Sequence, residues 1–225
     1  IGAAVEEAEE AGIPVILMDS DLEGREKSGY IGMDHKEAGK LAGEDMIAVT
    51  GGNAHIGMIV SDTDDSAQRL RMEGFLSAIN PHKNMIVEET FESRSDRIRI
   101  RKLVSGMLQD NKRINAIFCA DQTAADMLGD ILQEEGYSKN NMKVVCFGMS
   151  REIYKYLQDG TYTFSVMNDT VEMGYQAVKT LKDCINGKSG EKRIVYTEIE
   201  NADKDFDFES WKAEWENRER SCMMS

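Results

Sequence analysis

Few of the residues that mark metal centres or linkers are present in this chain. Its 225 residues include three histidines, without an HExxH motif or a Cys/His cluster, and two prolines, which form no Pro-rich linker. The four cysteines lack CxxC spacing, and a chain of this length needs no disulfide framework. We interpret these cysteines, Cys119, Cys146, Cys184 and Cys222, as structural or incidental thiols. We expect no metal and no cofactor.

Positive charge is also scarce, and long apolar runs are missing. Lys and Arg number 27 against 41 Asp and Glu, which gives a net charge of −14. Nucleic acids and anionic membrane surfaces attract basic patches, so we expect neither as a partner. No run approaches the roughly 20 apolar residues that span a bilayer. With 41% hydrophobic and 30% charged residues, the composition is that of a soluble globular protein with one large or two small domains.

Short apolar runs alternate with segments that carry apolar residues at helical spacing. Such alternation predicts parallel strands joined by right-handed helical crossovers, so the predicted fold class is α/β, doubly wound. The acidic tail, 201–225, is expected to form a helix packed on the body, or a connection to a part that has been removed. The predicted strands are 15–18, 30–33, 55–60, 85–90, 116–120, 143–147, 161–167 and 193–199. The predicted helices are 3–11, 35–49, 67–79, 96–108, 123–135, 153–157 and 171–185.

Polar side chains follow most of the predicted strands. The carboxyl ends of parallel strands form the edge where ligands bind. Carboxylates, amides and a guanidinium at this edge suit multidentate hydrogen bonding to a polyhydroxylated small molecule. No GxxxxGK[ST] or GxGxxG motif is present to hold a phosphate. The residues at these strand ends are Asp19, Ser20, Asp21, Ser61, Asp62, Thr63, Asp121, Gln122, Gly148, Met149, Ser150, Asn168 and Asp169, with Arg69 in the helix that follows one of them.

The "MDSDL" stretch also permits an enzyme. A strand ending in D-x-D is what a haloacid-dehalogenase-like phosphatase needs, with Asp19 as nucleophile and Asp21 as acid/base. That chemistry also needs a later acidic pair for Mg²⁺, and "CFGMSRE" supplies none. We therefore predict that the protein is not an enzyme.

Seven segments in register resemble the type 1 periplasmic binding proteins, close to their ribose-binding branch. The resemblance covers nearly all of the chain and implies two α/β lobes that close like a hinge on a sugar or sugar-like solute. The segments are "AEEAGIPVILMDSDL", "YIGMDHKEAGKLAGEDM", "IGMIVSDTDDSAQRLRMEGFLSAI", "INAIFCADQTAADMLGDILQEEG", "MKVVCFGMS", "LQDGTYTFSVMNDTVEMGYQAV" and "IVYTEI".

The resemblance also implies a ligand-binding set and a division into lobes. Residues 1–33 and 168–192 would form a partial N-terminal lobe, and 34–167 with 193–225 an essentially whole C-terminal lobe with an acidic tail. Most of the N-terminal lobe is then lacking, and the start at Ile1 in place of Met indicates a processed or trimmed chain. The implied ligand-binding residues are Asp19, Ser20, Arg69, Asp121, Gly148 and Asn168.

Some family positions are altered in this sequence. Ser20 stands where the family usually has Arg, and Gly148 replaces the usual Asp of "GFD". Asp121 and Asn168 stand where Asn and Gln are frequent, and Ser95 where an aromatic ring often stacks on the sugar.

Three of the implied residues have structural explanations that compete with ligand binding. Arg69 is spaced to pair with Asp65 or Glu73 on its own helix. Asp121 can cap the helix that follows it, with Thr123 taking part, and Asn168 can act as a hinge or turn residue.

The function implied by the resemblance is solute capture for an ABC importer. The partners would then be a small sugar-like ligand and a transporter permease, with membrane association only through an anchor removed from this chain. The location would be extracellular or periplasmic, at the outer face of the cell membrane. The same fold also serves the ligand-sensing domain of a signalling receptor or a LacI-type transcriptional regulator, so these remain alternatives.

Overall fold

The alternation of strands and helices is present in the computed structural model, which describes residues 1–138, 140–187 and 193–223. For residues 214, 215 and 218–223 only the backbone is described. Contacts divide the chain into a smaller unit, Ile1–Asp34, Asn168–Ile199 and Asp207–Ser225, and a larger unit, His35–Met167 and Glu200–Phe206. Within the described residues no helix is long and apolar enough to cross a membrane.

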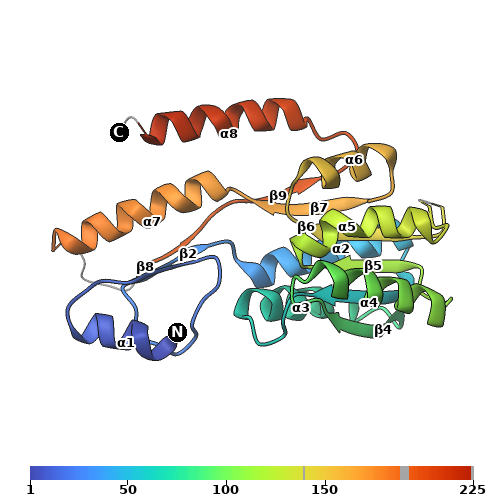
Figure 1. Cartoon of the computed structure of the whole chain (residues 1–225), viewed down its shortest axis with the longest axis horizontal. Coiled ribbons are helices and arrows are strands. Elements are labelled where there is room, and N and C mark those ends of the chain that lie inside the picture. The colour runs from blue at the N-terminus through green and yellow to red at the C-terminus, as the bar shows by residue number, and fades with distance from the viewer. Residues whose placement is uncertain (139, 188–192, 224–225) are drawn as a thin grey trace. The chain divides into compact units, whose positions relative to one another are not determined.

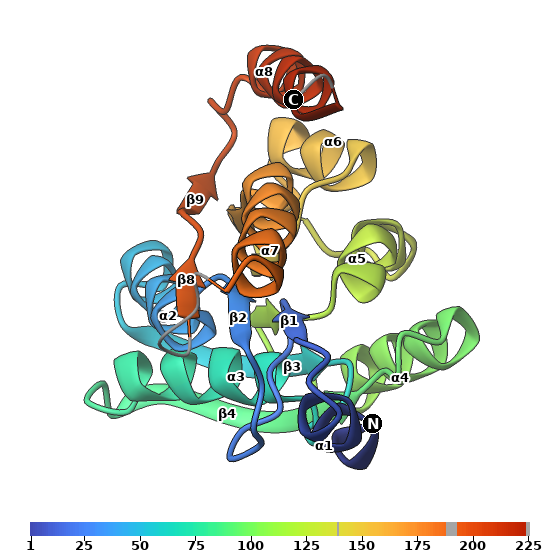
Figure 2. The same ribbon diagram turned by 90° about the vertical axis from the view of Figure 1, so that its left-hand side faces the viewer.

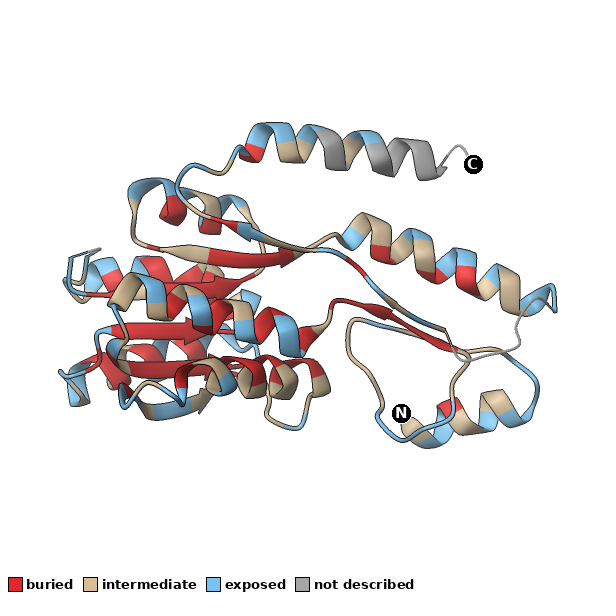
Figure 3. Cartoon of the chain, turned by 180° about the vertical axis from the view of Figure 1, so that it is seen from behind, coloured by how far each residue is buried: buried red, intermediate tan, exposed pale blue. Residues whose placement is uncertain are grey.

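A six-stranded sheet forms the centre of the larger unit, with the strand order β4-β3-β5-β6-β7-β9 (Figure 1). All strand pairs with a defined register are parallel, which confirms the predicted α/β, doubly wound class. The buried residues gather along these strands (Figure 3). The strands are β3 (Asn53–Val60), β4 (Asn84–Glu92), β5 (Ala116–Cys119), β6 (Lys143–Phe147), β7 (Phe164–Asn168) and β9 (Ile199–Ala202). The helices are α2 (His35–Thr50), α3 (Ser66–Ile79), α4 (Arg97–Asp110), α5 (Gln122–Glu134) and α6 (Arg151–Asp159).

Side-chain caps start the helices that follow the strands of this sheet. Asp65 accepts a hydrogen bond from the backbone N–H of Gln68 at the start of α3, and Asp96 caps α4 in the same way. Asp121 caps α5, and Ser150 caps α6. Each cap satisfies one N–H that the helix itself leaves unpaired. The polar residues at the carboxyl ends of the strands therefore have a structural role before any ligand is considered.

Helices α2 and α3 pack at very close range because glycines face each other across the contact. A Cβ atom on Gly74 would overlap the backbone oxygen of Lys36, and one on Gly39 would overlap the backbone oxygen of Arg71. A Cβ on Gly43 would lie 2.7 Å from the Cβ of Ala78. The two backbones can approach this closely only because the glycines have no side chain.

The smaller unit contains a three-stranded parallel sheet in the order β1-β2-β8. Helix α7 packs on this sheet, where Met173 and Ala177 cover Ile31 and the partly buried Ile16 and Val195 (Figure 2). The elements are α1 (Gly2–Glu10), β1 (Ile16–Met18), β2 (Gly29–Gly32), α7 (Thr170–Ile185), β8 (Arg193–Tyr196) and α8 (Phe208–Met223).

The single strand predicted for 193–199 is wrong. Its first part, β8, pairs with β2, and the pairing ends at Tyr196 opposite Gly32. The chain then enters β9, which lies beside β7 in the larger sheet. The contact-based division accordingly places Asn168–Ile199 and Asp207–Ser225 with the first 34 residues, whereas the sequence interpretation put 193–225 in the other lobe.

The predicted tail helix is present as α8, which contacts α7. Phe208 is buried, and its ring stacks on that of Trp211 at a centroid distance of 5.7 Å. The side chain of Trp215 lies outside the described residues.

Asp45 on α2 gives the larger unit a pH-dependent stability. Burial raises the pKa of its carboxyl group to about 6, even though Asn201 of β9 donates a 2.7 Å hydrogen bond to it. With a raised pKa, the folded state binds more protons than the unfolded state between about pH 4 and pH 6, so stability falls as the pH rises through this window. We expect Asp45→Asn to raise the free energy of unfolding by about 1 kcal/mol at pH 7, discounted for partial exposure, and by nothing below about pH 4.

Urea unfolding followed by circular dichroism at pH 4, 5, 6 and 7 measures this difference. Asp110→Asn, the same change at an exposed residue of the larger unit, is the control and should show no comparable trend. A stabilisation by Asp45→Asn that is equal at pH 4 and pH 7 would contradict the assignment.

Candidate functional site

The larger sheet has a topological switch between β3 and β5. The chain passes from β3 outward to β4, and from β5 in the other direction to β6 and β7. In open parallel sheets, ligands bind outside the carboxyl ends of the strands at such a point. Ser61 follows β3 and Asp121 follows β5, and the register places them at the same level, because Ile59 is opposite Cys119. The sheet therefore brings two of the predicted strand-end segments together.

Asp121 lies at this switch and is almost completely buried, with 4% of its surface exposed. One carboxylate oxygen accepts hydrogen bonds from the Thr123 backbone N–H, at 3.0 Å, and from the Ser95 hydroxyl, at 3.2 Å. The other oxygen accepts a short hydrogen bond from the hydroxyl of Ser93. The predicted capping role is confirmed, and the carboxylate is already held by protein donors.

Ser93 is a buried residue at this edge that the sequence interpretation missed. The cause was the strand boundary, because the predicted strand ended at residue 90 whereas β4 continues to Glu92. With the true boundary, "SRSD" directly follows the strand. The other edge residues were selected because they directly follow a predicted strand, so the same criterion would have selected Ser93.

Glu92, the last residue of β4, connects to the loop after β3. The backbone N–H and the hydroxyl of Thr63 both donate to one of its carboxylate oxygens. These hydrogen bonds lower the pKa of Glu92, and the positive charges of Arg94 and Arg99 add to the effect. Glu92 is therefore a fixed negative charge at the edge.

Two arginines on α3 have different environments. Arg69, the predicted ligand residue, is partly exposed and donates a 2.7 Å hydrogen bond to Glu73, so the predicted pairing on its own helix is confirmed. Arg71 is buried, and its guanidinium donates to the backbone oxygen of Ala120 at 3.0 Å. Its Nε also donates to Nδ1 of His35 at 3.2 Å, which requires a neutral imidazole ring. Arg71 therefore holds the backbone at Ala120, the residue that follows β5.

Gly148 has a backbone that disfavours a side chain. Its φ of 95° lies in the left-handed region, where residues with a Cβ are strained. Its N–H donates to the oxygen of Val166, and its carbonyl accepts from the Ser165 hydroxyl. The main-chain groups of this predicted ligand residue are thus already used within the sheet.

Asn168 is the last residue of β7 and is directly followed by Asp169, which caps α7 by accepting from the N–H of Glu172. It lies at the boundary where the contact-based division separates the two units.

Asp19 and Ser20 lie in the smaller unit, immediately after β1. Asp19 has a φ of 62°, and the Tyr30 hydroxyl donates a 2.5 Å hydrogen bond to its carbonyl. A left-handed residue other than glycine is a conformational outlier of the kind that clusters at functional sites. The neighbouring Asp21 forms a 2.6 Å ion pair with Lys27.

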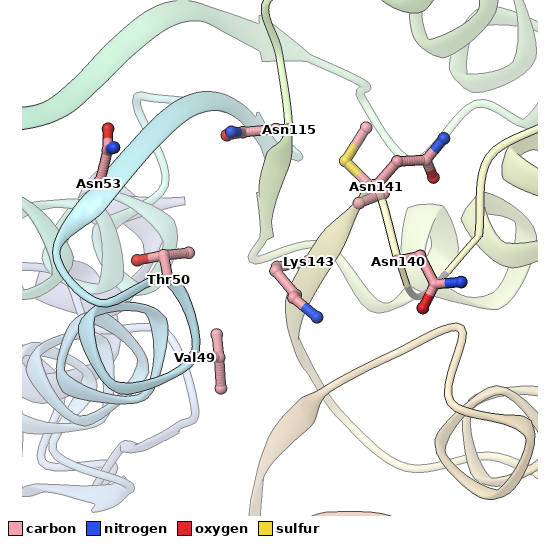
Figure 4. A pocket seen from close by; sticks show the side chains of 8 residues that line it. Val49, Thr50, Asn53, Asn115, Asn140, Asn141 and Lys143 are labelled. Carbon is pink, nitrogen blue, oxygen red and sulfur yellow. The ribbon is translucent and has the colours of Figure 1, made fainter.

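A pocket of about 420 Å³ lies at the opposite, amino-terminal edge of the larger sheet (Figure 4). Asn53 begins β3 and Lys143 begins β6, while Asn115 directly precedes β5. The sequence interpretation selected none of these residues. The lining residues are Val49, Thr50, Asn53, Asn115, Asn140, Asn141, Met142 and Lys143.

Two of the cysteines, Cys119 and Cys146, are buried in the larger unit, whereas Cys184 on α7 is half-buried. Cys119 and Cys146 are buried free thiols, and burial raises the pKa of Cys146 to about 12 and that of Cys119 well above its usual value. Thiols kept protonated in this way are inert, which confirms the structural interpretation for these two. In the parts of the chain that are described, no three His, Cys, Asp or Glu side chains are grouped as metal ligands. The side chain of Cys222 lies outside these parts.

A parallel α/β sheet with polar strand ends at a topological switch is an architecture that many ligand-binding proteins share. Residues 1–189 match the periplasmic binding protein domain family, and the chain belongs to it as a ribose-binding-like, type 1 member. The ribose import binding protein RbsB of Escherichia coli is 26% identical over 189 residues, which are 84% of this chain and 62% of that protein. RbsB of Bacillus subtilis is 23% identical, over 86% of this chain and 62% of its own length.

Solved structures of solute-binding proteins have a fold similar to that of this chain. GanP, a glucose-galactose binding protein from Geobacillus stearothermophilus, has a TM-score of 0.86 at 25% identity, over 90% of this chain and 72% of its own. A solute-binding protein from Burkholderia graminis in complex with D-arabinose also has a TM-score of 0.86 at 25% identity, over 91% and 71%. The relatives are solute-binding proteins, which supports the prediction of a non-enzyme. The chain spans less than two thirds of the length of the curated relatives named above.

Proposed function

We propose that this protein binds a sugar or sugar-like polar solute, with the carboxyl edge of the larger sheet as part of the binding surface. The observation that carries the proposal is the position of Ser61–Thr63 and Asp121 on either side of the topological switch. Hydroxyl, amide and carboxylate groups at one edge can share the hydrogen bonds of several sugar hydroxyls. Membership of a sugar-binding family supports the same conclusion.

The protein acts in this proposal as the solute-binding component of an ABC importer. A transporter permease would be its partner, and its place would be the periplasm or the outer face of the cell membrane, where an anchor would hold it. Support comes from the curated relatives, which are ribose import binding proteins. The sugar would be captured and released without chemical change.

Among the predicted residues, Arg69 and Asp19 are the strongest candidates for contact with the solute. Arg69 is partly exposed, and its pair with Glu73 is an ordinary i,i+4 pair that a ligand can replace at small cost. Asp19 occupies an outlier conformation at a strand end. Ser20 and Asn168 complete the proposed set, while Gly148 would contribute shape and no side chain.

A thermal-shift screen followed by isothermal titration calorimetry tests the function. The panel is D-ribose, D-arabinose, D-fucose, D-glucose and D-galactose. A sugar at 100 times its dissociation constant stabilises the fold by about 2.7 kcal/mol, so we expect Tm to rise by about 5 to 10 °C with at least one of them. Absence of any shift or heat across the panel would contradict sugar binding.

Arg69→Ala and Asp19→Ala should each remove this shift while leaving the Tm of the ligand-free protein within about 2 °C of the parent. Lys143→Ala, at the amino-terminal pocket, is the matched control and should retain the full shift. Loss of the shift in Lys143→Ala alone would move the binding site to that pocket.

A further inference from the structure

Two consecutive residues after β4 have left-handed backbones although neither is glycine. Arg94 has a φ of 54° and Ser95 a φ of 51°. Residues with a side chain adopt this region only at a conformational cost, and they persist there only when the surrounding structure holds them. Contacts with the surrounding structure must therefore hold the turn Ser93–Ser95 in this conformation.

The support consists of hydrogen bonds on each backbone N–H of the turn. The N–H of Ser93 donates to the oxygen of Val60, and that of Arg94 to the oxygen of Ser61, both at 2.8 Å. The N–H of Ser95 donates to the hydroxyl oxygen of Ser93 at 3.0 Å. The Ser93 hydroxyl thus accepts from the turn while it donates to Asp121.

Asp121, which follows a different strand, links the two ends of this turn. It accepts hydrogen bonds from the hydroxyls of Ser93 and Ser95, the first and last residues of the turn. Ser93 is 1% exposed and Asp121 is 4% exposed, whereas Arg94 and Ser95 are exposed at the carboxyl edge. The buried pair therefore holds an exposed pair in place.

We infer that Asp121 is a positioning residue, which holds the Ser93–Ser95 turn in its left-handed form so that Arg94 and Ser95 meet the solute preorganised. The effect on the solute rests on the proposed function. This role differs from the expectation that Asp121 itself binds the sugar, because its carboxylate already accepts hydrogen bonds from protein donors. Preorganisation of this kind raises affinity, since less ordering remains to be done on binding.

A double-mutant cycle with Ser93→Ala and Asp121→Ala tests the inference. Ser93 is buried, so a direct role in binding is excluded for it, yet we expect each single variant to weaken sugar affinity by about tenfold and the double variant by no more than either. Affinity unchanged in Ser93→Ala, or losses that multiply in the double variant, would overturn the inference. Asp65→Ala removes a helix cap without touching the turn, and should leave affinity unchanged despite its cost in stability.

A glycine rescue separates the turn from general damage. In the Asp121→Ala background, Ser95→Gly supplies a residue that adopts positive φ without strain, and should restore part of the Tm that Asp121→Ala loses. A further fall in Tm in this double variant would count against positioning.

Amide hydrogen exchange tests the positioning without any ligand. In the parent protein the amides of residues 93–96 are hydrogen-bonded, and Asp121→Ala should speed their exchange while the amides of β6 stay protected. Unchanged exchange at residues 93–96 overturns the inference. If the parent protein binds no sugar on the panel, the proposed function fails, and this exchange result still decides the role of Asp121.

Discussion

Gly74→Ala is expected to destabilise the protein by about 3 kcal/mol, because a single methyl group would force α2 and α3 apart. The new Cβ would overlap the backbone oxygen of Lys36, and a backbone atom in a helix cannot move aside as the end of a flexible side chain can. The gain in helix propensity from replacing glycine, about 1 kcal/mol, is too small to offset this overlap. Tm should fall by about 6 to 12 °C.

Gly106→Ala is the matched control for this substitution. Gly106 also lies within a helix, α4, but nothing lies within 4 Å of the position that its Cβ would take. We therefore expect Gly106→Ala to raise stability by about 0.5 to 1 kcal/mol. Thermal and urea unfolding of the two variants measure the difference, and a Gly74→Ala variant as stable as Gly106→Ala would show that the helices are not in this close contact.

Arg71→Leu is expected to cost about 2 to 4 kcal/mol, because it removes one partner from a buried polar network. The substitution leaves Nδ1 of His35 without its donor and deprives the oxygen of Ala120 of one of its two side-chain donors, the other being Gln68. It also removes the guanidinium that lies 4.6 Å from the centroid of the Phe147 ring. The loss should be seen as a lower urea midpoint with an unchanged m-value.

Arg69→Leu, two residues earlier on the same helix, is the control for Arg71→Leu. Its ion pair with Glu73 is partly exposed, so its removal should change stability by no more than about 0.5 kcal/mol. The two variants therefore separate two roles, since Arg71→Leu should damage the fold and Arg69→Leu should damage sugar binding alone. Equal losses of stability in both variants would contradict this separation.

The proposed binding edge of the larger sheet includes groups that already take part in hydrogen bonds within the protein. Asp121 and Gly148 are occupied by protein partners, and Glu92 is fixed by Thr63. Groups that are held in this way bind through shape and preorganisation as much as through their own hydrogen bonds.

The sequence by itself determined the class of fold, the order of nearly all elements and the edge of the sheet where polar residues gather. These follow from hydrophobic periodicity and from strand ends, which are local properties of the chain. Helix caps such as Asp121 and the i,i+4 pair of Arg69 with Glu73 were predictable for the same reason, because each involves neighbours in sequence.

Only the tertiary structure decided what each edge residue contacts. The pairing of Asp121 with Ser93 joins residues 28 positions apart, and the contact of Arg71 with the end of β5 joins residues 49 apart. The division of 193–199 between two sheets likewise depends on which strands lie beside it. Such partners are set by the arrangement of elements in space, which local patterns do not encode. For this reason the polar edge was predictable from the sequence, whereas the role of Asp121 as a support for the neighbouring turn was not.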